Sequence, residues 1–397
     1  MQMKSRFRRF ALRLGLPLVG VAALGAGTLV LSTGCLATLG RTPEPERLAK
    51  LAVQSRYADG RFENLEPPSP PWTGERPSLF EVFFGGERRR PSVRLPLAAP
   101  EAALDGPPHE GARVTWFGHS TLLIEVDGAR VLTDPIWSER ASPSSLIGPV
   151  RFHSPLVPLA ALPKLDAVII SHDHYDHLDM DTVQALAKTG ARFFVPLGIA
   201  DHLREWDVPP AQVVELDWWG EARVTPEVTL VATPSRHYSG RTRGTRNTTL
   251  WASWVVRGAR HRVYFSGDSG PTPQFEEIGR RLGPFDLVAL EVGAFHPAWG
   301  DIHLGPEKAL EAHRMLGGGP LLPIHWATFN LAAHPWDEPI ERVVRLAEER
   351  GVRLVTPMLG EPLVAGEGAG SAAWWRGVGA VEATRREDRA RPLEAAR

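Results

Sequence analysis

Short apolar runs alternate with polar or glycine-containing turns between residues 111 and 365. Runs of this kind predict buried β-strands. The predicted strands are Val114–Trp116, Thr121–Val126, Arg130–Thr133, Ala167–Ile170, Arg192–Val195, Val213–Leu216, Val228–Ala232, Leu250–Val256, His261–Phe265, Leu287–Val292, Leu321–Trp326 and Arg353–Thr356. Helices are predicted over Asp179–Lys188, Pro273–Leu282, Pro306–Leu316 and Ile340–Arg350. Strands and helices that interleave in this way indicate an α/β fold.

Side chains able to bind a metal follow four of the predicted strands. The stretch 172–177 follows Ala167–Ile170, while His237, Asp268 and His325 each follow a later strand. Because residues at strand ends converge on one edge of a sheet, we expect these side chains to meet. Seven potential ligands suit two metal ions better than one, with Asp268 able to bridge them. The candidate ligands are His172, His174, Asp176, His177, His237, Asp268 and His325.

The densest part of this pattern is the stretch from His172 to His177, which places three histidines and Asp176 within six residues. A single histidine is usually a surface residue or a hydrogen-bonded core residue. Four such groups directly after a buried strand are hard to explain by packing, because each would need its own polar partner if buried. Nitrogen ligands with a carboxylate are typical of zinc and similar divalent metals.

Two further polar residues have open roles. His119 lies in a glycine-containing loop, and it is either near the metal site or bonded to the local backbone. Asp179 begins the helix after the metal-binding stretch. It is either the N-cap of that helix or a carboxylate that orients a ligand histidine.

The amino-acid composition limits the possible partners and metal ligands. Formal net charge is −1, so there is no strong basic field, and nucleic acid is not expected as a partner. The only cysteine is Cys35, which excludes an intrachain disulfide and a multi-thiolate metal site. Histidine and carboxylate must therefore supply the metal ligands.

The beginning of the chain has the pattern of an export signal. Basic residues precede the apolar run Leu14–Leu31, and Cys35 follows shortly after. The segment resembles the lipid-attachment box of bacterial lipoproteins, with Cys35 as the attachment site. It departs from that box in having Ser32 where leucine is usual. The alternative is an uncleaved membrane anchor. Both predict a protein exported to the periplasmic side and held on a membrane.

Four regions follow from these patterns. Residues 1–35 form the predicted signal, and residues 36–110 are a proline-rich linker and extension that includes the apolar patch Phe80–Phe84. The catalytic domain is predicted over residues 111–365. Residues 366–397, rich in Ala, Gly and Arg, are predicted to be a flexible tail.

The ligand pattern resembles that of the metallo-β-lactamase superfamily, whose fold is an αββα sandwich of two mixed sheets with helices outside. Further segments resemble one branch, the N-acyl-phosphatidylethanolamine-hydrolysing phospholipases D. These segments are Trp116–Thr121, Leu132–Ile136, Arg140–Pro143, Ser171–Asp179, Phe194–Gly198, Glu215–Trp219, Phe275–Gly279, Gly283–Leu287 and Ile324–Trp326. They span most of residues 113 to 360. The superfamily pattern implies the fold but not the substrate. The additional segments imply activity on a lipid.

The resemblance implies two zinc ions. One is held by His172, His174 and His237, the other by Asp176, His177 and His325, with Asp268 between them.

The implied reaction is hydrolysis of an N-acyl-phosphatidylethanolamine-like lipid to phosphatidic acid and an N-acylethanolamine by metal-bound hydroxide. Asp176, Asp268 and His303 are the implied catalytic residues, with His303 near the substrate phosphate. Asp134 and Asp179 are candidates for orienting ligand histidines. Two departures from the mammalian enzyme lie near the expected pocket: Glu291 and the segment 296–302.

Other interpretations stay open. The same fold with the same ligands also serves a hydrolase of a soluble phosphoester or lactone. A membrane-tethered binding protein without activity is a further alternative, although a complete ligand set argues against it. Iron or manganese fits a His/Asp site as zinc does. The expected partners are a phospholipid substrate and a membrane surface, and the resemblance implies a homodimer.

Overall fold

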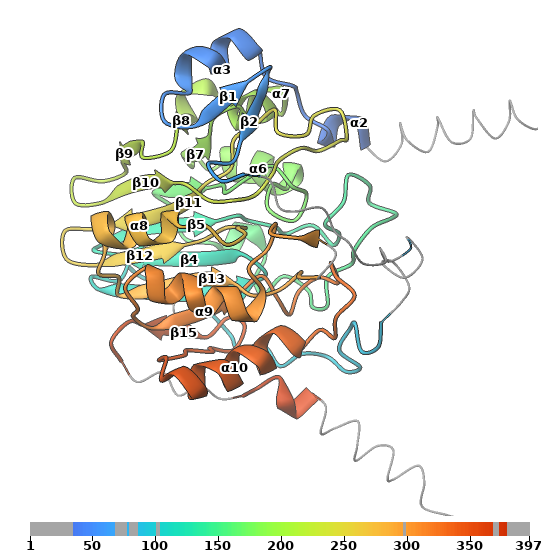
Figure 1. The fold of residues 1–397 in the computed structure, drawn as a ribbon, viewed down its shortest axis with the longest axis vertical. Coiled ribbons are helices and arrows are strands. Elements are labelled where there is room, and N and C mark those ends of the chain that lie inside the picture. Colours follow the sequence, from blue (N-terminus) through green and yellow to red (C-terminus); the bar gives the residue numbers. More distant parts are fainter. Residues whose placement is uncertain are drawn as a thin grey trace, which may run out of the picture.

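Two β-sheets form the centre of the protein (Figure 1). The computed structural model describes residues 35–67, 78, 86–100, 104–296, 299–367 and 373–378. The seven-stranded sheet has the order β15 (Pro362–Val364), β3 (Ala112–Gly118), β4 (Thr121–Val126), β5 (Ala129–Thr133), β6 (Ala167–Ile169), β7 (Phe193–Pro196) and β8 (Val213–Leu216). The six-stranded sheet has the order β14 (Leu321–Ile324), β13 (Leu287–Glu291), β12 (Arg262–Phe265), β11 (Ser253–Arg257), β10 (Thr229–Thr233) and β9 (Glu221–Arg223).

Helices cover the outer faces of both sheets. The seven-stranded sheet carries α6 (Met180–Ala187) and α7 (Ile199–Glu205), and the six-stranded sheet carries α8 (Gln274–Leu282), α9 (Gly305–Met315) and α10 (Glu338–Arg350). Short 3₁₀ turns lie at Leu159–Ala161 and Pro210–Gln212. This layering confirms the predicted αββα sandwich of two mixed sheets.

Successive side chains of a strand point to opposite faces of the sheet, which explains how one sheet contributes to two cores. In β4, Leu122 and Ile124 belong to the core between the sheets, while Leu123 belongs to a separate apolar cluster that includes Val183 and Leu186 of α6. Both faces of the strand are therefore buried, which is why it has the near-continuous apolar sequence that made it predictable.

Strand directions in the six-stranded sheet bring several strand ends to one edge. β12, β13 and β14 are parallel. β10 pairs antiparallel with β11, which pairs antiparallel with β12, so β10 runs in the same direction as β12. The carboxyl ends of all four strands therefore lie at the same edge. The parallel strands β5 and β6 supply the corresponding edge of the other sheet.

The extension before the catalytic domain is more than a linker, which corrects the prediction for its described part. It forms α2 (Cys35–Thr38), α3 (Pro45–Leu51) and the hairpin β1 (Arg56–Ala58)–β2 (Arg61–Glu63). Leu48 and Phe62 are fully buried in the main core, and Arg47 pairs with Glu215 and Asp201. In Figure 1, α3 and this hairpin lie beside α7 and β8. A few well-placed apolar residues suffice to dock a proline-rich segment.

Two predictions about the C-terminal part are wrong. Arg353–Thr356 is not a strand, because Leu354 makes only an isolated bridge to Leu321, and Pro357 cannot donate the next ladder hydrogen bond. The last strand of the described chain is β15, at the edge of the seven-stranded sheet. The tail is not wholly detached either: Trp374 and Trp375 are buried against Trp326.

The predicted signal in residues 1–34 and the apolar patch Phe80–Phe84 lie outside the described residues. Within the part of the chain that is described, no helix combines the length and the apolar character needed to cross a membrane.

Candidate metal centre

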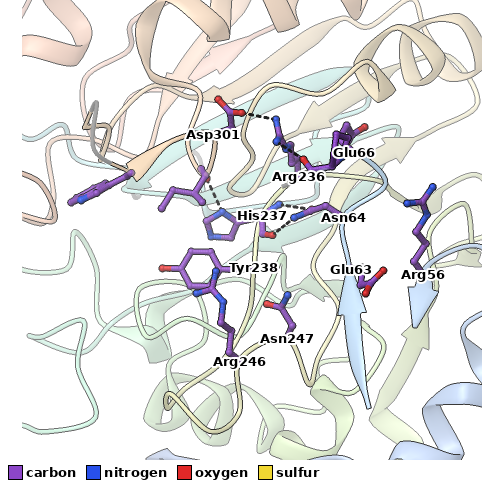
Figure 2. Close-up of a pocket in the computed structure, with 13 residues that line it drawn as sticks. Arg56, Glu63, Asn64, Glu66, Arg236, His237, Tyr238, Arg246, Asn247 and Asp301 are labelled. Carbon is purple, nitrogen blue, oxygen red and sulfur yellow. Dashed lines mark hydrogen bonds and ion pairs between the residues drawn. The ribbon is translucent and has the colours of Figure 1, made fainter. Parts of the chain in front are cut away.

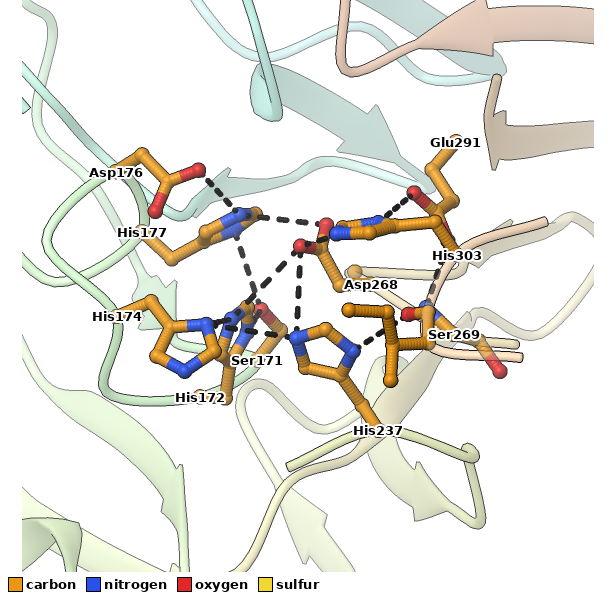
Figure 3. Close-up of polar contacts among 12 residues, drawn as sticks. Ser171, His172, His174, Asp176, His177, His237, Asp268, Ser269, Glu291 and His303 are labelled. Carbon is orange, nitrogen blue, oxygen red and sulfur yellow. Dashed lines mark hydrogen bonds and ion pairs between the residues drawn. The ribbon is translucent and has the colours of Figure 1, made fainter. Parts of the chain in front are cut away.

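The seven candidate ligands meet where the strand ends of the two sheets face each other. Figure 3 labels all of them except His325. The loop after β6 supplies four of them, and the loops after β10, β12 and β14 supply one each. The backbone is unusual here, because His119, Asp134 and His325 all adopt positive φ angles, of 50°, 34° and 65°. Non-glycine residues rarely take this conformation, and it concentrates at functional sites.

The first group consists of His172, His174 and His237. Nδ1 of His174 lies 2.8 Å from Nε2 of His172 and 3.4 Å from Nε2 of His237, so three imidazole nitrogens point at one position. Burial and the neighbouring imidazoles lower the pKa of His172 and of His237 well below the usual value. These histidines are therefore neutral, the form that binds a metal.

The second group consists of Asp176, His177 and His325. Oδ2 of Asp176 lies 3.3 Å from Nε2 of His177 and 3.5 Å from Nε2 of His325. Burial alone would lower the pKa of His325, but Asp268 and Asp176 raise it to about 10. Burial also opposes the charged form of His177, yet the same two carboxylates raise its pKa well above the usual value. Without metal, the histidines of this group are therefore protonated, whereas His172 and His237 of the first group are neutral.

Asp268 lies between the two groups, and each of its oxygens faces a different one. Oδ2 lies 3.9 Å from Nε2 of His172 and 3.7 Å from Nε2 of His237. Oδ1 lies 3.3 Å from Nε2 of His177 and 3.1 Å from Nε2 of His325. A carboxylate in this position is able to bind one ion through each oxygen.

Buried atoms without hydrogen-bond partners show that the residues fit bound metal ions. Among the described residues, Nε2 of His177, both ring nitrogens of His325 and Oδ1 of Asp268 are buried and have no such partner. An unpaired buried polar atom is costly unless something else binds it. Three of these four atoms point into the space between the ligand groups, where a divalent ion would satisfy them.

Hydrogen bonds behind the ligands fix their orientation. Nδ1 of His177 donates to Oδ2 of Asp134 at 2.7 Å, and Nδ1 of His237 donates to the carbonyl of Ile302 at 2.7 Å. The Ser171 hydroxyl donates to Asp134 at 2.6 Å and lies 2.9 Å from Nδ1 of His172. Asp134 thus has the orienting contact that was predicted for it.

Asp179 is the N-cap residue of α6, which is one of its two predicted roles, and its carbonyl accepts the hydrogen bond from the backbone N–H of Val183. Its side chain bonds no backbone N–H group of that helix. Its carboxylate instead accepts hydrogen bonds from the backbone N–H groups of Trp137 and Ser138 and from the hydroxyl of Thr182. These bonds fasten the 137–138 loop to α6 rather than orienting a ligand.

Two other residues near the centre had no specific role assigned from the sequence, although a position of His119 near the site was one of its two open alternatives and Glu291 was a departure near the expected pocket. Nε2 of His119 donates to Oδ2 of Asp176 at 3.0 Å. Burial and the nearby His325 lower the pKa of His119 to about 3, so it is neutral. Glu291, at the end of β13, accepts a hydrogen bond from Nδ1 of His303 at 2.7 Å. Glu291 ends its strand just as the candidate ligands follow theirs, and this position is the sequence feature that could have identified it.

The centre opens into a cavity of about 480 Å³. Its lining includes His174, Asp176, Asp268, His303 and His325, together with the apolar side chains Ala141 and Leu331. Four of the seven candidate ligands thus border the cavity, and His303 faces the same space.

A second chamber of about 490 Å³ adjoins this cavity and shares Tyr238, Trp299 and Ile302 with it. Figure 2 shows that its wall combines the loop after β10 with residues that follow β2. Its polar lining includes Arg56, Asn64, Arg236, Arg246, Asn247 and Asp301. Arg236 is paired with Asp301 at 3.0 Å, and Arg246 lies over the ring of Tyr238. We refer to it as the polar chamber because charged and amide side chains line much of it, beside Tyr238, Trp299 and Ile302, whereas Ala141 and Leu331 line the metal cavity.

Comparison with known proteins gives matches of three kinds. The family described as the beta-lactamase superfamily domain matches residues 129–326. An uncharacterised protein of Mycobacterium tuberculosis is 48% identical over 381 residues, covering 93% of this chain and 99% of the relative. The N-acyl-phosphatidylethanolamine-hydrolysing phospholipase D 1 of Caenorhabditis elegans is 34% identical over 301 residues, covering 70% of this chain and 84% of that enzyme.

Among solved structures, the isothiocyanate hydrolase from Delia radicum gut bacteria has a TM-score of 0.51 at 22% sequence identity. The match covers 64% of this chain and 99% of that structure. At this identity the likeness concerns the fold alone.

Proposed function

The chain belongs to the beta-lactamase superfamily as a metal-dependent hydrolase, and on this premise we propose that it hydrolyses phosphodiester bonds of N-acyl-phosphatidylethanolamine-like lipids. The reaction is of phospholipase D type and releases phosphatidic acid and an N-acylethanolamine. The observation that carries the proposal is Asp268, whose two oxygens face two separate ligand groups. The relationship to the C. elegans enzyme supports the lipid substrate.

Two divalent ions fit the ligands. His172, His174 and His237 would hold one ion and Asp176, His177 and His325 the other, with Asp268 shared. When bound, such ions lower the pKa of water toward neutrality and offset the negative charge of a phosphodiester. We propose zinc because the ligands are mainly imidazoles, while iron and manganese accept the same set.

A side chain that lines the cavity would bind the phosphate and supply the proton for the leaving oxygen. His303 is held through Nδ1 by Glu291, so its other nitrogen is free for the substrate. Burial opposes the charge of His303, but Glu291 and Asp268 raise its pKa. A protonated His303 would bind a non-bridging phosphate oxygen or donate a proton to the leaving oxygen. No side chain needs to form a covalent intermediate.

The test is turnover of N-acyl-phosphatidylethanolamine in mixed micelles, with metal content measured on the same sample. We expect release of phosphatidic acid by protein that carries about two metal ions per chain. Asp268→Asn is the control and should lose both metal and activity. Two bound ions with no lipid cleavage would reject the lipid substrate, and absence of metal binding would reject the centre itself.

A soluble phosphodiester is the second candidate substrate, and the polar chamber favours it. Acyl chains do not suit a wall that contains Arg56, Arg246 and Asn64. A substrate with a polar group on one side of the phosphate would place that group there. Faster cleavage of glycerophosphoethanolamine than of the N-acylated lipid would favour this candidate.

A further inference from the structure

Three of the six large apolar side chains that are exposed among the described residues lie on two segments, α2 and the 143–148 loop. Leu36, Leu146 and Ile147 expose 56%, 54% and 70% of their surfaces. The hydroxyl of Thr38, at the end of α2, donates to the carbonyl of Pro143 at 3.1 Å. This bond joins α2 to the 143–148 loop. Apolar groups that stay exposed on a folded protein often mark an interaction surface.

The loop that carries Leu146 and Ile147 is held in shape from within. Nε of Arg140 donates to the carbonyl of Ser145 at 3.0 Å, and Nη1 donates to the carbonyl of Gly148 at 2.9 Å. The exposed side chains are therefore presented on a loop whose carbonyl groups at Ser145 and Gly148, on either side of them, are bonded to one guanidinium. Such a loop is able to place apolar side chains in a lipid surface while leaving few unpaired backbone groups.

The same loop is continuous with the wall of the metal cavity. Ala141 lines the cavity and packs in an apolar cluster with Ile136 and Phe329, with Leu331 against it. The exposed loop thus directly follows, along the chain, a residue that lines the metal cavity. A lipid held by the loop would meet this wall before it met the polar chamber.

On its inner side, α2 is fastened to the metal-binding loop. Nε1 of Trp206 donates to the carbonyl of Ala37, and Nε of Arg241 donates to the carbonyl of Thr38. The same guanidinium donates through Nη1 to the carbonyl of Asp173, within the metal-binding loop. The position of α2 is therefore fixed relative to the metal centre.

The sequence before α2 indicates what covers this face. The apolar run Leu14–Leu31 ends five residues before Leu36, a separation of at most roughly 17 Å along an extended chain. A bilayer that holds this run, or a lipid attached at Cys35, must therefore lie close to α2. A second protein has no comparable reason to be there.

We propose that α2 and the 143–148 loop form a membrane-docking face, in which Leu36, Leu146 and Ile147 enter the lipid surface and direct the metal cavity towards substrate in the bilayer. This proposal rests on the proposed lipid function. Its occupant is a phospholipid surface.

A solvent-sensitive label tests the docking face without any need for activity. In the full chain with Cys35→Ser, a fluorescent nitrobenzoxadiazole label is placed at Ile147→Cys or, as control, at Leu97→Cys. Leu97 is 42% exposed, but its neighbour Ala98 bonds Leu359 near β15, at the sheet edge opposite β8. On phosphatidylcholine vesicles we expect the emission of the label at 147 to shift to the blue and that at 97 to stay unchanged. An unshifted label at 147 on vesicle-bound protein would overturn the proposal, as would a shift that grows with protein concentration in the absence of lipid.

Activity gives the second readout. Leu146→Asp/Ile147→Asp should lower turnover of N-acyl-phosphatidylethanolamine in vesicles about tenfold, because two apolar contacts with lipid are lost. Hydrolysis of soluble bis(p-nitrophenyl) phosphate should stay unchanged, as should both activities of Leu97→Asp. Equal loss on the soluble and vesicle substrates would contradict docking. A label that enters the bilayer in a protein that cleaves no lipid would instead reject the proposed function and leave the docking face standing.

Discussion

The two ligand groups of the centre have similar geometry but opposite electrostatics. His172, His174 and His237 contain no carboxylate, and the pKa of each is lowered by burial. In the other group, the carboxylates outweigh burial and raise the pKa of His177 and His325. One group is therefore ready to bind a metal, while the other must first lose protons.

This difference gives the second group two roles. Without metal, protonated His177 and His325 neutralise Asp176 and Asp268, so that no uncompensated charge is buried. A bound metal ion would replace these protons as the source of positive charge. The first group has no such internal compensation and contributes little to the metal-free fold. The following experiments test this asymmetry.

The largest effect is expected from Asp268→Asn, because Asp268 is the one residue that both groups share. The loss of a bridging anion should release metal from both groups and lower turnover by about a thousandfold, since metal catalysis contributes several kcal/mol. Metal analysis and single-turnover rates on the same sample provide the measurement. A variant that keeps two ions and its rate would show that the two groups do not depend on a shared carboxylate.

Removing one histidine from each group should separate their structural roles. In the metal-free chain, His325→Ala leaves protonated His177 as the remaining histidine counter-charge for both Asp268 and Asp176. One buried carboxylate charge is then uncompensated, at a cost of roughly 3–5 kcal/mol. His237→Ala removes a neutral side chain and its bond to Ile302, at a cost of about 1 kcal/mol. Urea unfolding in the presence of chelator compares the two. Equal losses would mean that the raised pKa of His325 has no structural importance.

The pH dependence of the metal-free chain should follow from the same asymmetry. His325 has a pKa of about 10 in the folded state, above its unfolded value of about 6.5. Its contribution to stability is thus complete below pH 6.5 and is lost as pH rises towards 10. Metal affinity should change in the opposite direction, rising with pH, because binding displaces protons. Unfolding of chelated protein at pH 6.5 and 9 tests this, and His325→Ala should flatten the slope.

The strand-end ligands were predictable because hydrophobic runs locate strands, and parallel strands bring their ends to one edge. The contact between His119 and Asp176 was not, since it joins two loops that are 57 positions apart in the sequence. Glu291 was identified only as a departure from the mammalian enzyme near the expected pocket, without a role. Its bond to His303 crosses from β13 to a loop whose path the local sequence does not determine.

Segments of low-complexity composition were the least predictable. The described part of the proline-rich extension docks through Leu48 and Phe62, and the tail docks through Trp374 and Trp375. Composition describes an average, whereas docking depends on a few apolar residues that find space on an existing core. The short edge strands β9 and β15 were not predicted for the same reason. Their pairing depends on the neighbouring strand rather than on their own hydrophobic pattern.

Asp134→Asn is expected to have a smaller effect, which is confined to the metal affinity of the second group. Its carboxylate accepts the Nδ1 proton of His177, which belongs to the second group. An amide is a weaker acceptor, so His177 should become a poorer ligand, with a loss of about 10–100-fold in affinity for one ion. Stepwise metal titration against a competing chelator measures both sites. Equal weakening of the two sites would contradict the assignment, because only Ser171 connects Asp134 to His172.

The smallest effect on metal binding is expected from Asp179→Asn, which serves as the matched control for Asp134. Both are buried aspartates beside the metal-binding loop, and both were candidates for orienting a ligand. The carboxylate of Asp179, however, bonds Trp137, Ser138 and Thr182. The substitution should leave both metal affinities within about twofold while lowering stability by about 1 kcal/mol, since one acceptor oxygen becomes a donor. A loss of metal as large as that of Asp134→Asn would mean that the loop it fastens, rather than direct contact with a ligand, controls the second site.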